Sequence, residues 1–386
     1  MDFTYYIPTR ILFGAGQLKR LHEQQLPGKK ALIVITAGKS MKANGYLDRV
    51  EEQLDMAGVE HVLFDRILPN PVLRHVMEGA AVAKANGCDF VLGLGGGSSM
   101  DAAKAIAVMA SNPGDYWDYN FGITGKGLPV PNDPLPIVAV TTTAGTGSES
   151  DPWTVTTKEE TREKCGFGYD KTFPALSIVD PDLMMTVPPA LTAYQGFDAL
   201  FHATESVISN GAHIVSEMFA LKAIELIAKY LPAAVNDGSD QEARAHVALA
   251  NTLAGFFMYC TSEHSIEHAL SAYHGELPHG AGLIMVSLAY YQHFVDARAC
   301  DERFIKMAKA MGVENAANAQ DFVDALKKLE SDCGVADLKM SDYGVTESEL
   351  PKLAENARGA SGGLYNGDPV PLSDSDVTKI LEKSYR

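Results

Sequence analysis

The first half of the chain has short, continuous hydrophobic runs separated by amphipathic segments. Residues 30–36 (KALIVIT) and 90–94 (FVLGL) are two such runs. A continuous run is typical of a parallel strand that is buried on both faces. A strand with one face exposed to solvent would instead alternate between apolar and polar residues. The pattern predicts an edge strand or hairpin within 3–18, further strands at 61–64, 137–140 and 175–179, and helices at 40–58, 72–86 and from about 100 onward.

The second half has a different pattern. After Val187-Pro188-Pro189, strand-like runs are nearly absent and apolar residues recur with helical spacing. This spacing predicts helices at 191–209, 214–231, 241–259, 266–272, 281–297, 301–311, 317–329, 347–355 and 373–383. We therefore expect two domains, as a length of 386 residues also suggests. Residues 1–188 would form an α/β dinucleotide-binding domain with a Rossmann-like parallel sheet, and residues 189–386 an all-α metal-binding and catalytic domain.

Two short segments of the second half contain the strongest candidate chemistry. In 196–206 (GFDALFHATES), Asp198 and His202 are four residues apart, so a helix places them on one face. In 263–280, His264 and His268 repeat this spacing, and His274 and His279 follow. A single helical histidine is more often a packed residue than a ligand. One carboxylate with several imidazoles, however, is a donor set that suits a divalent metal.

Two polar turns follow strands of the first half. Gly95-Gly96-Gly97-Ser98 lies between a strand and a helix, an order that suits phosphate because glycines admit a close approach and the helix N-terminus attracts anions. It is not a GxGxxG motif. Residues 141–149 (TTTAGTGSE) form a second turn, which could bind a cofactor or simply satisfy its own backbone. Two such turns on one sheet favour a single dinucleotide that crosses both.

Composition narrows the class of protein. The chain is 46% hydrophobic and 21% charged, as in globular proteins, and its net charge of −17 argues against nucleic acid or an anionic membrane as a partner. The five cysteines are scattered without a CxxC pair, which predicts a reducing compartment. Neither a signal peptide nor an apolar run of membrane-spanning length is visible. We expect a cytoplasmic protein.

Taken together, the motifs resemble those of the iron-containing (group III) alcohol dehydrogenases. The resemblance covers about three hundred residues and rests on the order and content of seven segments. These segments are FGAG at 13–16, PNP at 69–71, GGGSSMDAAKAIA at 95–107, TTTAGTGSE at 141–149, DPDLM at 180–184, and GFDALFHATE at 196–205 followed by the histidine-rich segment that ends at 280.

The resemblance implies a metal-dependent alcohol dehydrogenase or aldehyde reductase that transfers a hydride between NAD(P)(H) and a small primary alcohol or aldehyde. The implied metal is Fe²⁺, or Zn²⁺ or Mn²⁺, in a shell without thiolate. Its implied ligands are Asp198, His202, His264 and His279. His264 is preferred to His268 because the first histidine of the pair normally coordinates in this family. His268 and His274 would then stand nearby as candidates for catalytic proton transfer.

The resemblance also implies which residues hold the cofactor. They are Gly96, Gly97, Ser98, Asp101, Thr141, Thr142, Thr146 and Lys164, together with Gly38, Lys39 and Ser40 at the end of the first buried strand. Members that prefer NAD commonly carry an aspartate at that strand end, where it contacts the ribose hydroxyls. Here Ala37 stands in its place, and Lys39 and Ser40 follow. We therefore expect NADP to be preferred over NAD.

Several alternatives remain open from sequence alone. A lyase resembling dehydroquinate synthase would need a Lys/Arg cluster near the metal, and none is evident between residues 196 and 280. Glycerol dehydrogenases, maleylacetate reductases and a metal-stabilised binding module are further alternatives that explain fewer motifs.

Aromatic residues near the motifs, Phe197 and Phe201 among them, favour a short alkyl substrate, and Ser150 with Asp151 could contact the second hydroxyl of a diol. Family members often form dimers or larger homo-oligomers, and the edge strand at 5–12 is a plausible pairing surface.

Overall fold

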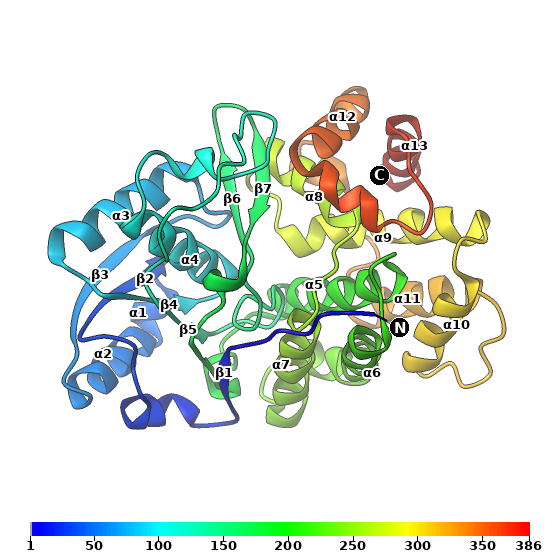
Figure 1. Cartoon of the computed structure of the whole chain (residues 1–386). Coiled ribbons are helices and arrows are strands. Elements are labelled where there is room, and N and C mark those ends of the chain that lie inside the picture. The colour runs from blue at the N-terminus through cyan, green and yellow to red at the C-terminus, as the bar shows by residue number, and fades with distance from the viewer. Residues whose placement is uncertain (1) are drawn as a thin grey trace. The chain divides into compact units, whose positions relative to one another are not determined.

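The computed structural model describes residues 2–386 and divides them into two compact units (Figure 1). The sheet unit contains residues 4–161 and 165–186, and the helical unit contains residues 2–3, 162–164 and 187–386. The chain passes from one to the other between Thr186 and Val187. The short segment 162–164, which lies in the first half of the sequence, belongs to the helical unit.

The sheet unit is built on six parallel strands, which confirms the predicted fold class. Their order across the sheet is β1 (Arg10–Phe13), β8 (Leu176–Val179), β5 (Ile137–Thr141), β4 (Phe90–Gly95), β2 (Lys30–Thr36) and β3 (Glu60–Ile67). All carboxyl ends therefore lie at the same edge. Strands β2, β4 and β5 are neighbours, so the polar segments that follow them are brought side by side.

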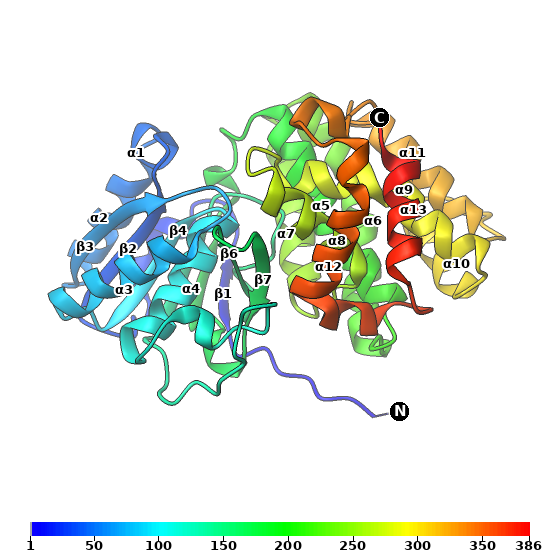
Figure 2. The same cartoon turned by 90° about the horizontal axis from the view of Figure 1, so that it is seen from above.

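Helices cover both faces of this sheet. Ala31, Ile33 and Ile35 of β2 belong to one hydrophobic cluster, with α2 (Tyr46–Met56), whereas Leu32 and Val34 belong to another, with α3 (Leu73–Asn86) and α4 (Gly97–Ser111). Figure 2 shows α3 and α4 on the opposite side of the strands from α2. Successive strand residues point to opposite faces, so burial on both sides explains why the run is hydrophobic throughout. Helix α1 (Ser40–Ala43) follows β2, and two further strands, β6 (Thr154–Lys158) and β7 (Glu163–Phe167), pair with each other; the first two residues of β7 belong to the helical unit.

The helical unit contains nine α-helices within its described residues: α5 (Pro189–Ile208), α6 (Ile214–Asn236), α7 (Gln241–Gly255), α8 (Ser262–Tyr273), α9 (His279–Asp296), α10 (Asp301–Ala310), α11 (Gln320–Asp332), α12 (Leu350–Ser361) and α13 (Asp374–Ser384). Helix α5 begins with proline at its first turn, where the missing N–H costs nothing. Helix α8 begins four residues before the predicted start at 266, so both His264 and His268 are helical. Within residues 2–386, no helix has both the length and the apolar character that crossing a membrane requires.

Phe197 and Phe201 of α5 are fully buried and lie against each other, and Phe201 also stacks on Tyr291 of α9. Their rings therefore form part of the helical core. They hold α5 against α9 and so position the polar residues on those two helices.

Candidate active site

Helix α5 supplies the first two residues of the predicted metal site. Asp198 and His202 are 4% and 5% exposed, and His202 Nδ1 lies 3.6 Å from Asp198 Oδ1. The four-residue spacing in the sequence becomes one helical turn, as predicted. A charged or polar side chain this deeply buried needs partners, so these two residues indicate a built site.

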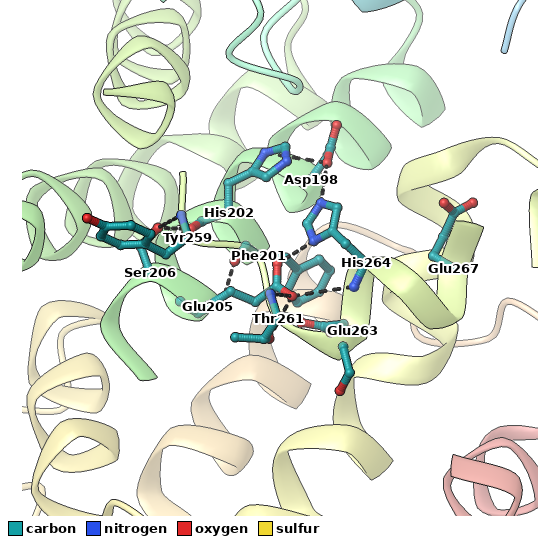
Figure 3. A network of polar contacts seen from close by, with 12 residues as sticks. Asp198, Phe201, His202, Glu205, Ser206, Tyr259, Thr261, Glu263, His264 and Glu267 are labelled. Carbon is teal, nitrogen blue, oxygen red and sulfur yellow. Dashed lines mark hydrogen bonds and ion pairs between the residues drawn. The ribbon is translucent and has the colours of Figure 1, made fainter. Parts of the chain in front are cut away.

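Helices α8 and α9 bring the other two residues to the same carboxylate oxygen. His264 Nε2 and His279 Nε2 each lie 3.5 Å from Asp198 Oδ1 (Figure 3 shows Asp198, His202 and His264). Donor atoms that share one tetrahedral ion at bond lengths of about 2.0–2.2 Å are about 3.3–3.6 Å apart. The three carboxylate–imidazole distances of 3.5–3.6 Å match that separation.

The lack of hydrogen bonds to some of these donor atoms also favours a bound cation. Asp198 Oδ1 and His264 Nε2 are buried and have no hydrogen-bond partner among the described residues. Buried polar atoms are normally paired, so two facing polar atoms without a hydrogen-bond partner are costly. A divalent cation bound by both would remove this cost. The residues therefore fit the metal that the motifs imply.

Two carboxylates that the sequence analysis missed orient the histidines. Glu205 Oε2 contacts His264 Nδ1, and Glu267 Oε2 contacts His279 Nδ1. A carboxylate oxygen accepts the hydrogen bond, so each ring donates its Nδ1–H and Nε2 is the nitrogen directed at Asp198. The signal was present in the sequence, since Glu205 lies two turns beyond Asp198 on α5 and Glu267 lies three residues beyond His264.

Glu205 is in turn held by the segment that precedes α8. The backbone N–H and the hydroxyl of Thr261 donate to Glu205 Oε1 at 2.9 and 2.8 Å, and the Thr261 hydroxyl also lies 2.7 Å from the Tyr290 hydroxyl (Figure 3 shows Glu205 and Thr261). These contacts fix the rotamer of a fully buried carboxylate. The orientation of His264 thus depends on three elements of the chain, α5, α8 and α9.

Burial and neighbouring charges set the protonation of these groups. Burial opposes ionisation of Asp198, but the imidazoles of His202, His279 and His264 outweigh it and hold the pKa of Asp198 well below its ordinary value. Burial lowers the pKa of His202 to about 4. Asp198 is therefore a carboxylate and His202 a neutral imidazole at neutral pH. These are the forms that bind a metal.

His268 and His274, the two candidates for proton transfer, lie in different surroundings. His268 is buried, its Nδ1 has no hydrogen-bond partner in the described chain, and its ring centroid is 5.5 Å from that of His279. Burial, followed by the charge of Lys164, holds the pKa of His268 well below its ordinary value. His274 Nε2 contacts Glu349 instead, in the turn before α12.

Cys260 lies next to two of the candidate ligand histidines. Its Sγ is within 4.8 Å of a ring nitrogen of His202 and of one of His264. Helix α7 ends at Gly255 rather than at 259, so the segment that follows it returns past α5 before α8 begins. Burial raises the pKa of the Cys260 thiol, which favours the protonated form. We therefore keep the metal shell to one carboxylate and three imidazoles.

Helices α5 and α9 meet at a glycine next to His279, a candidate metal ligand. A Cβ at Gly280 would lie 2.0 Å from the carbonyl oxygen of Tyr194, one turn before Asp198. No side chain larger than hydrogen fits against this backbone atom. Gly280 therefore allows the helices to come close enough for His279 to reach Asp198.

The predicted cofactor residues gather at the carboxyl edge of the parallel sheet. The glycine turn follows β4 and the threonine turn follows β5, and Thr142 N donates to Gly95 O at 2.9 Å. A Cβ at Gly97 would lie 2.4 Å from Thr146 Cγ2, so the two turns pack directly on each other. Helix α4 has fifteen residues and starts at Gly97, so its free N–H groups and positive dipole end lie in the glycine turn.

Asp101 and its surroundings form a buried network in the sheet unit. The Ser148 hydroxyl and the Val155 N–H donate to Asp101, and the ammonium of Lys104 donates to Ser148 and to Asp151. Ser150 Oγ donates to Gly147 O. Ser150 and Asp151 are therefore buried and hydrogen-bonded within the sheet unit. This burial argues against the expectation that they contact a second hydroxyl of the substrate.

The residues that bear on NADP preference are exposed at the carboxyl end of β2. Ala37, Gly38, Lys39 and Ser40 all face solvent, and Ala37 N donates to Ile67 O of the neighbouring strand β3. Lys164, by contrast, lies in the helical unit, where its ammonium contacts Glu267 and Ser271. The remaining predicted cofactor residues all belong to the sheet unit.

The fold and these two sites define a class: a dinucleotide-binding α/β unit joined to a helical unit with an Asp/His metal centre. Comparison with known proteins agrees. The model of the iron-containing alcohol dehydrogenase family matches residues 8–181, and the model of the C-terminal domain of the Fe-containing alcohol dehydrogenase family matches residues 192–385. The chain belongs to the iron-containing alcohol dehydrogenase family.

Individual relatives are similar along their whole length. The 1,3-propanediol dehydrogenase of Klebsiella pneumoniae is 36% identical, with 99% of each chain covered. The NAD-dependent methanol dehydrogenase of Bacillus methanolicus is 35% identical, with 98% of this chain and 99% of the relative covered. The crystal structure of an archaeal halo-thermophilic alcohol dehydrogenase from a Red Sea brine pool superimposes with a TM-score of 0.94 at 36% identity, covering 100% of this chain and 99% of the other. The chain is thus an oxidoreductase of the alcohol dehydrogenase type, and the lyase alternative finds no support.

Proposed function

We propose that Asp198, His202, His264 and His279 together bind one divalent metal, Fe²⁺ first, with Zn²⁺ or Mn²⁺ as alternatives. The observation that carries this proposal is the placement of three imidazole nitrogens 3.5–3.6 Å from Asp198 Oδ1. His264 is preferred to His268 because its Nε2 reaches this carboxylate. A set of oxygen and imidazole donors without thiolate suits these three ions.

When bound, the metal would act as a Lewis acid on the substrate oxygen, and the nicotinamide would accept or deliver the hydride. The chain's own residues have three tasks. Asp198 and the three imidazoles bind the ion, and Glu205 and Glu267 keep the Nε2 atoms directed at it. The His279 side chain is 21% exposed, against 4–6% for the other three, so substrate would approach from its side.

His268 is the residue that we propose to accept and return the proton. Its Nδ1 has no hydrogen-bond partner in the described part of the chain and is the atom that would accept the proton. His274 remains the second candidate, but its Nε2 is occupied by Glu349. The proton would pass through water or a ribose hydroxyl to reach either residue.

For the cofactor, we propose that Gly96, Gly97 and Ser98 bind the pyrophosphate and that Thr141, Thr142 and Thr146 contact the ribose and nicotinamide. Asp101 would act on these turns through Ser148, to which it is hydrogen-bonded. We also propose that NADP is preferred over NAD. An aspartate at the end of β2 would repel a 2′-phosphate, whereas Lys39 and Ser40, both exposed there, could bind it.

The substrate that we propose is a short primary alcohol or the matching aldehyde. The related propanediol and methanol dehydrogenases act on small molecules of this kind, as their names state. A diol remains a candidate through the first of these relatives.

The test is an anaerobic assay of protein stripped of metal with a chelator. NADPH and NADH oxidation would be followed with butyraldehyde and 3-hydroxypropanal, before and after addition of Fe²⁺, Zn²⁺ or Mn²⁺. We expect turnover only with metal, faster with NADPH. The His202→Ala variant should bind NADPH as the parent does but show no turnover. A metal-free protein that is fully active, or an active His202→Ala variant, would refute the proposed site.

A further inference from the structure

Lys164 is a buried lysine whose ammonium makes two hydrogen bonds near the proposed metal site. Its side chain is 5% exposed, and its Nζ donates to Ser271 Oγ at 2.9 Å and to Glu267 Oε2 at 3.4 Å. Both partners are on α8, one turn apart. Lysine is almost never buried without a partner of opposite charge, and here Glu267, which is fully buried, supplies that charge.

The same carboxylate oxygen serves a metal ligand. Glu267 Oε2 is the atom that contacts both Lys164 Nζ and His279 Nδ1. The Lys164 ammonium and the His279 imidazole therefore both contact the Glu267 carboxylate, which links them. The Glu267 side chain also packs closely on α9, because a Cβ at Gly282 would lie 2.8 Å from Glu267 Cγ.

We propose that Lys164 is a positioning residue of the metal centre, which holds Glu267 in the place where it orients His279. The proposal rests on the metal site of the proposed function. An unpaired carboxylate in a buried site is costly, so without the ammonium Glu267 would turn toward other donors or water. His279 would then lose the contact that directs its Nε2 at Asp198. Loss of a group that orients a ligand typically weakens metal binding by about 10–100-fold.

This role differs from the cofactor contact that the sequence analysis expected of Lys164. An ammonium has three N–H donors, and two of them are used within the helical unit. The two roles make different predictions for a measurement made without nucleotide. A positioning residue changes metal affinity in the absence of any cofactor, whereas a cofactor contact does not.

The experiment measures the dissociation constant for Zn²⁺ by competition with a chromophoric chelator, with neither nucleotide nor alcohol present. Lys164→Met keeps the apolar stem and removes the charge, and we expect Zn²⁺ to bind about tenfold more weakly. Lys104→Met is the matched control, because Lys104 is equally buried and also pairs with a carboxylate, Asp151, that contacts no ligand histidine. Its Zn²⁺ affinity should stay within about twofold of the parent.

A double variant tests the route through Glu267. In a Glu267→Gln background, adding Lys164→Met should change Zn²⁺ affinity by less than about twofold, since the carboxylate that Lys164 holds is gone. If Lys164→Met alone fails to fold, Ser271→Ala removes the hydroxyl that fixes the ammonium and should weaken Zn²⁺ binding by about two- to fivefold.

The proposal is overturned if Lys164→Met, or Ser271→Ala in its place, binds Zn²⁺ as the parent does, or if Lys164→Met weakens binding equally in both backgrounds. A Lys164→Met protein that loses only NADPH affinity would assign the residue to the cofactor alone. The proposed function fails separately, if the parent binds metal but reduces no aldehyde with either nucleotide.

Discussion

Replacement of Gly280 by alanine should disrupt the metal site without touching any of its donor atoms. Gly280 is the second residue of α9, next to the proposed ligand His279. The added Cβ would lie 2.0 Å from the carbonyl oxygen of Tyr194 and 2.6 Å from its carbonyl carbon. Because both obstacles are backbone atoms of α5, rotation of a side chain cannot relieve the clash.

The expected displacement follows from these distances. A carbon and a carbonyl oxygen in contact are about 3.3 Å apart, so the helices would have to separate by about 1.3 Å. If that shift were transmitted fully, the 3.5 Å between Asp198 Oδ1 and His279 Nε2 would become about 4.8 Å. Two ligands on opposite sides of one ion, with bonds of about 2.1 Å, are only about 4.2 Å apart.

We therefore expect Gly280→Ala to weaken Zn²⁺ binding by at least about 100-fold, which corresponds to about 2.7 kcal/mol. The overpacked seam should also destabilise the metal-free fold by about 1–3 kcal/mol, partly offset by the higher helix propensity of alanine. Metal affinity would be measured by chelator competition and stability by urea unfolding of the metal-free protein.

Gly196→Ala is the matched control. It also adds a methyl group to a close contact of α5, but the nearest obstacle is Leu231 Cδ1 at 2.2 Å, the flexible end of a side chain on α6. It should cost stability and leave Zn²⁺ affinity within about threefold. If Gly280→Ala binds Zn²⁺ as tightly as Gly196→Ala does, the α5–α9 spacing does not control the site.

Three further predictions concern other residues. His264→Ala should lose stoichiometric metal on dialysis, whereas His268→Ala should retain it and lower kcat; metal analysis of both variants would show the reverse if His268 were the ligand. Burial raises the pKa of Asp368 to about 6 from 3.8, so the folded protein binds this proton more tightly than the unfolded chain does. The stability that Asp368 adds is complete below about pH 4 and is lost as the pH rises through 6, by about 2–3 kcal/mol, and Asp368→Asn should flatten this slope in urea unfolding between pH 4 and 7. Ala37→Asp should lower the ratio of kcat/KM for NADPH to that for NADH by at least about tenfold; an unchanged ratio would show that the end of β2 does not face the 2′-phosphate.

The sequence alone was enough to predict the parallel sheet and the approximate positions of most helices. Residues 31–35 and 90–94 contain no polar side chain because each strand is covered on both faces, so this burial can be recognised in the sequence. Asp198 and His202 could be placed on one face for a similar reason, since one helical turn is a local property. Local spacing thus predicted each half of the metal site separately.

Only the tertiary structure decided how these halves meet. The ligand role of His264 depends on α8 beginning at Ser262 and on a carboxylate from α5 fixing its ring. The contacts of Lys164 with Glu267 join residues that are 103 positions apart, and no spacing rule relates them. Ser150 and Asp151 looked available for substrate until the structure buried them beside Lys104.

The physical reason is the range of the forces involved. Hydrophobic periodicity and helical spacing are set within a few residues, so they can be recognised in one sequence. Whether a polar side chain faces a ligand or another buried group depends on which elements pack against it, and a single close contact such as that of Gly280 with Tyr194 decides this. The sequence therefore determined the elements and the donor residues, and packing determined which donors share one site.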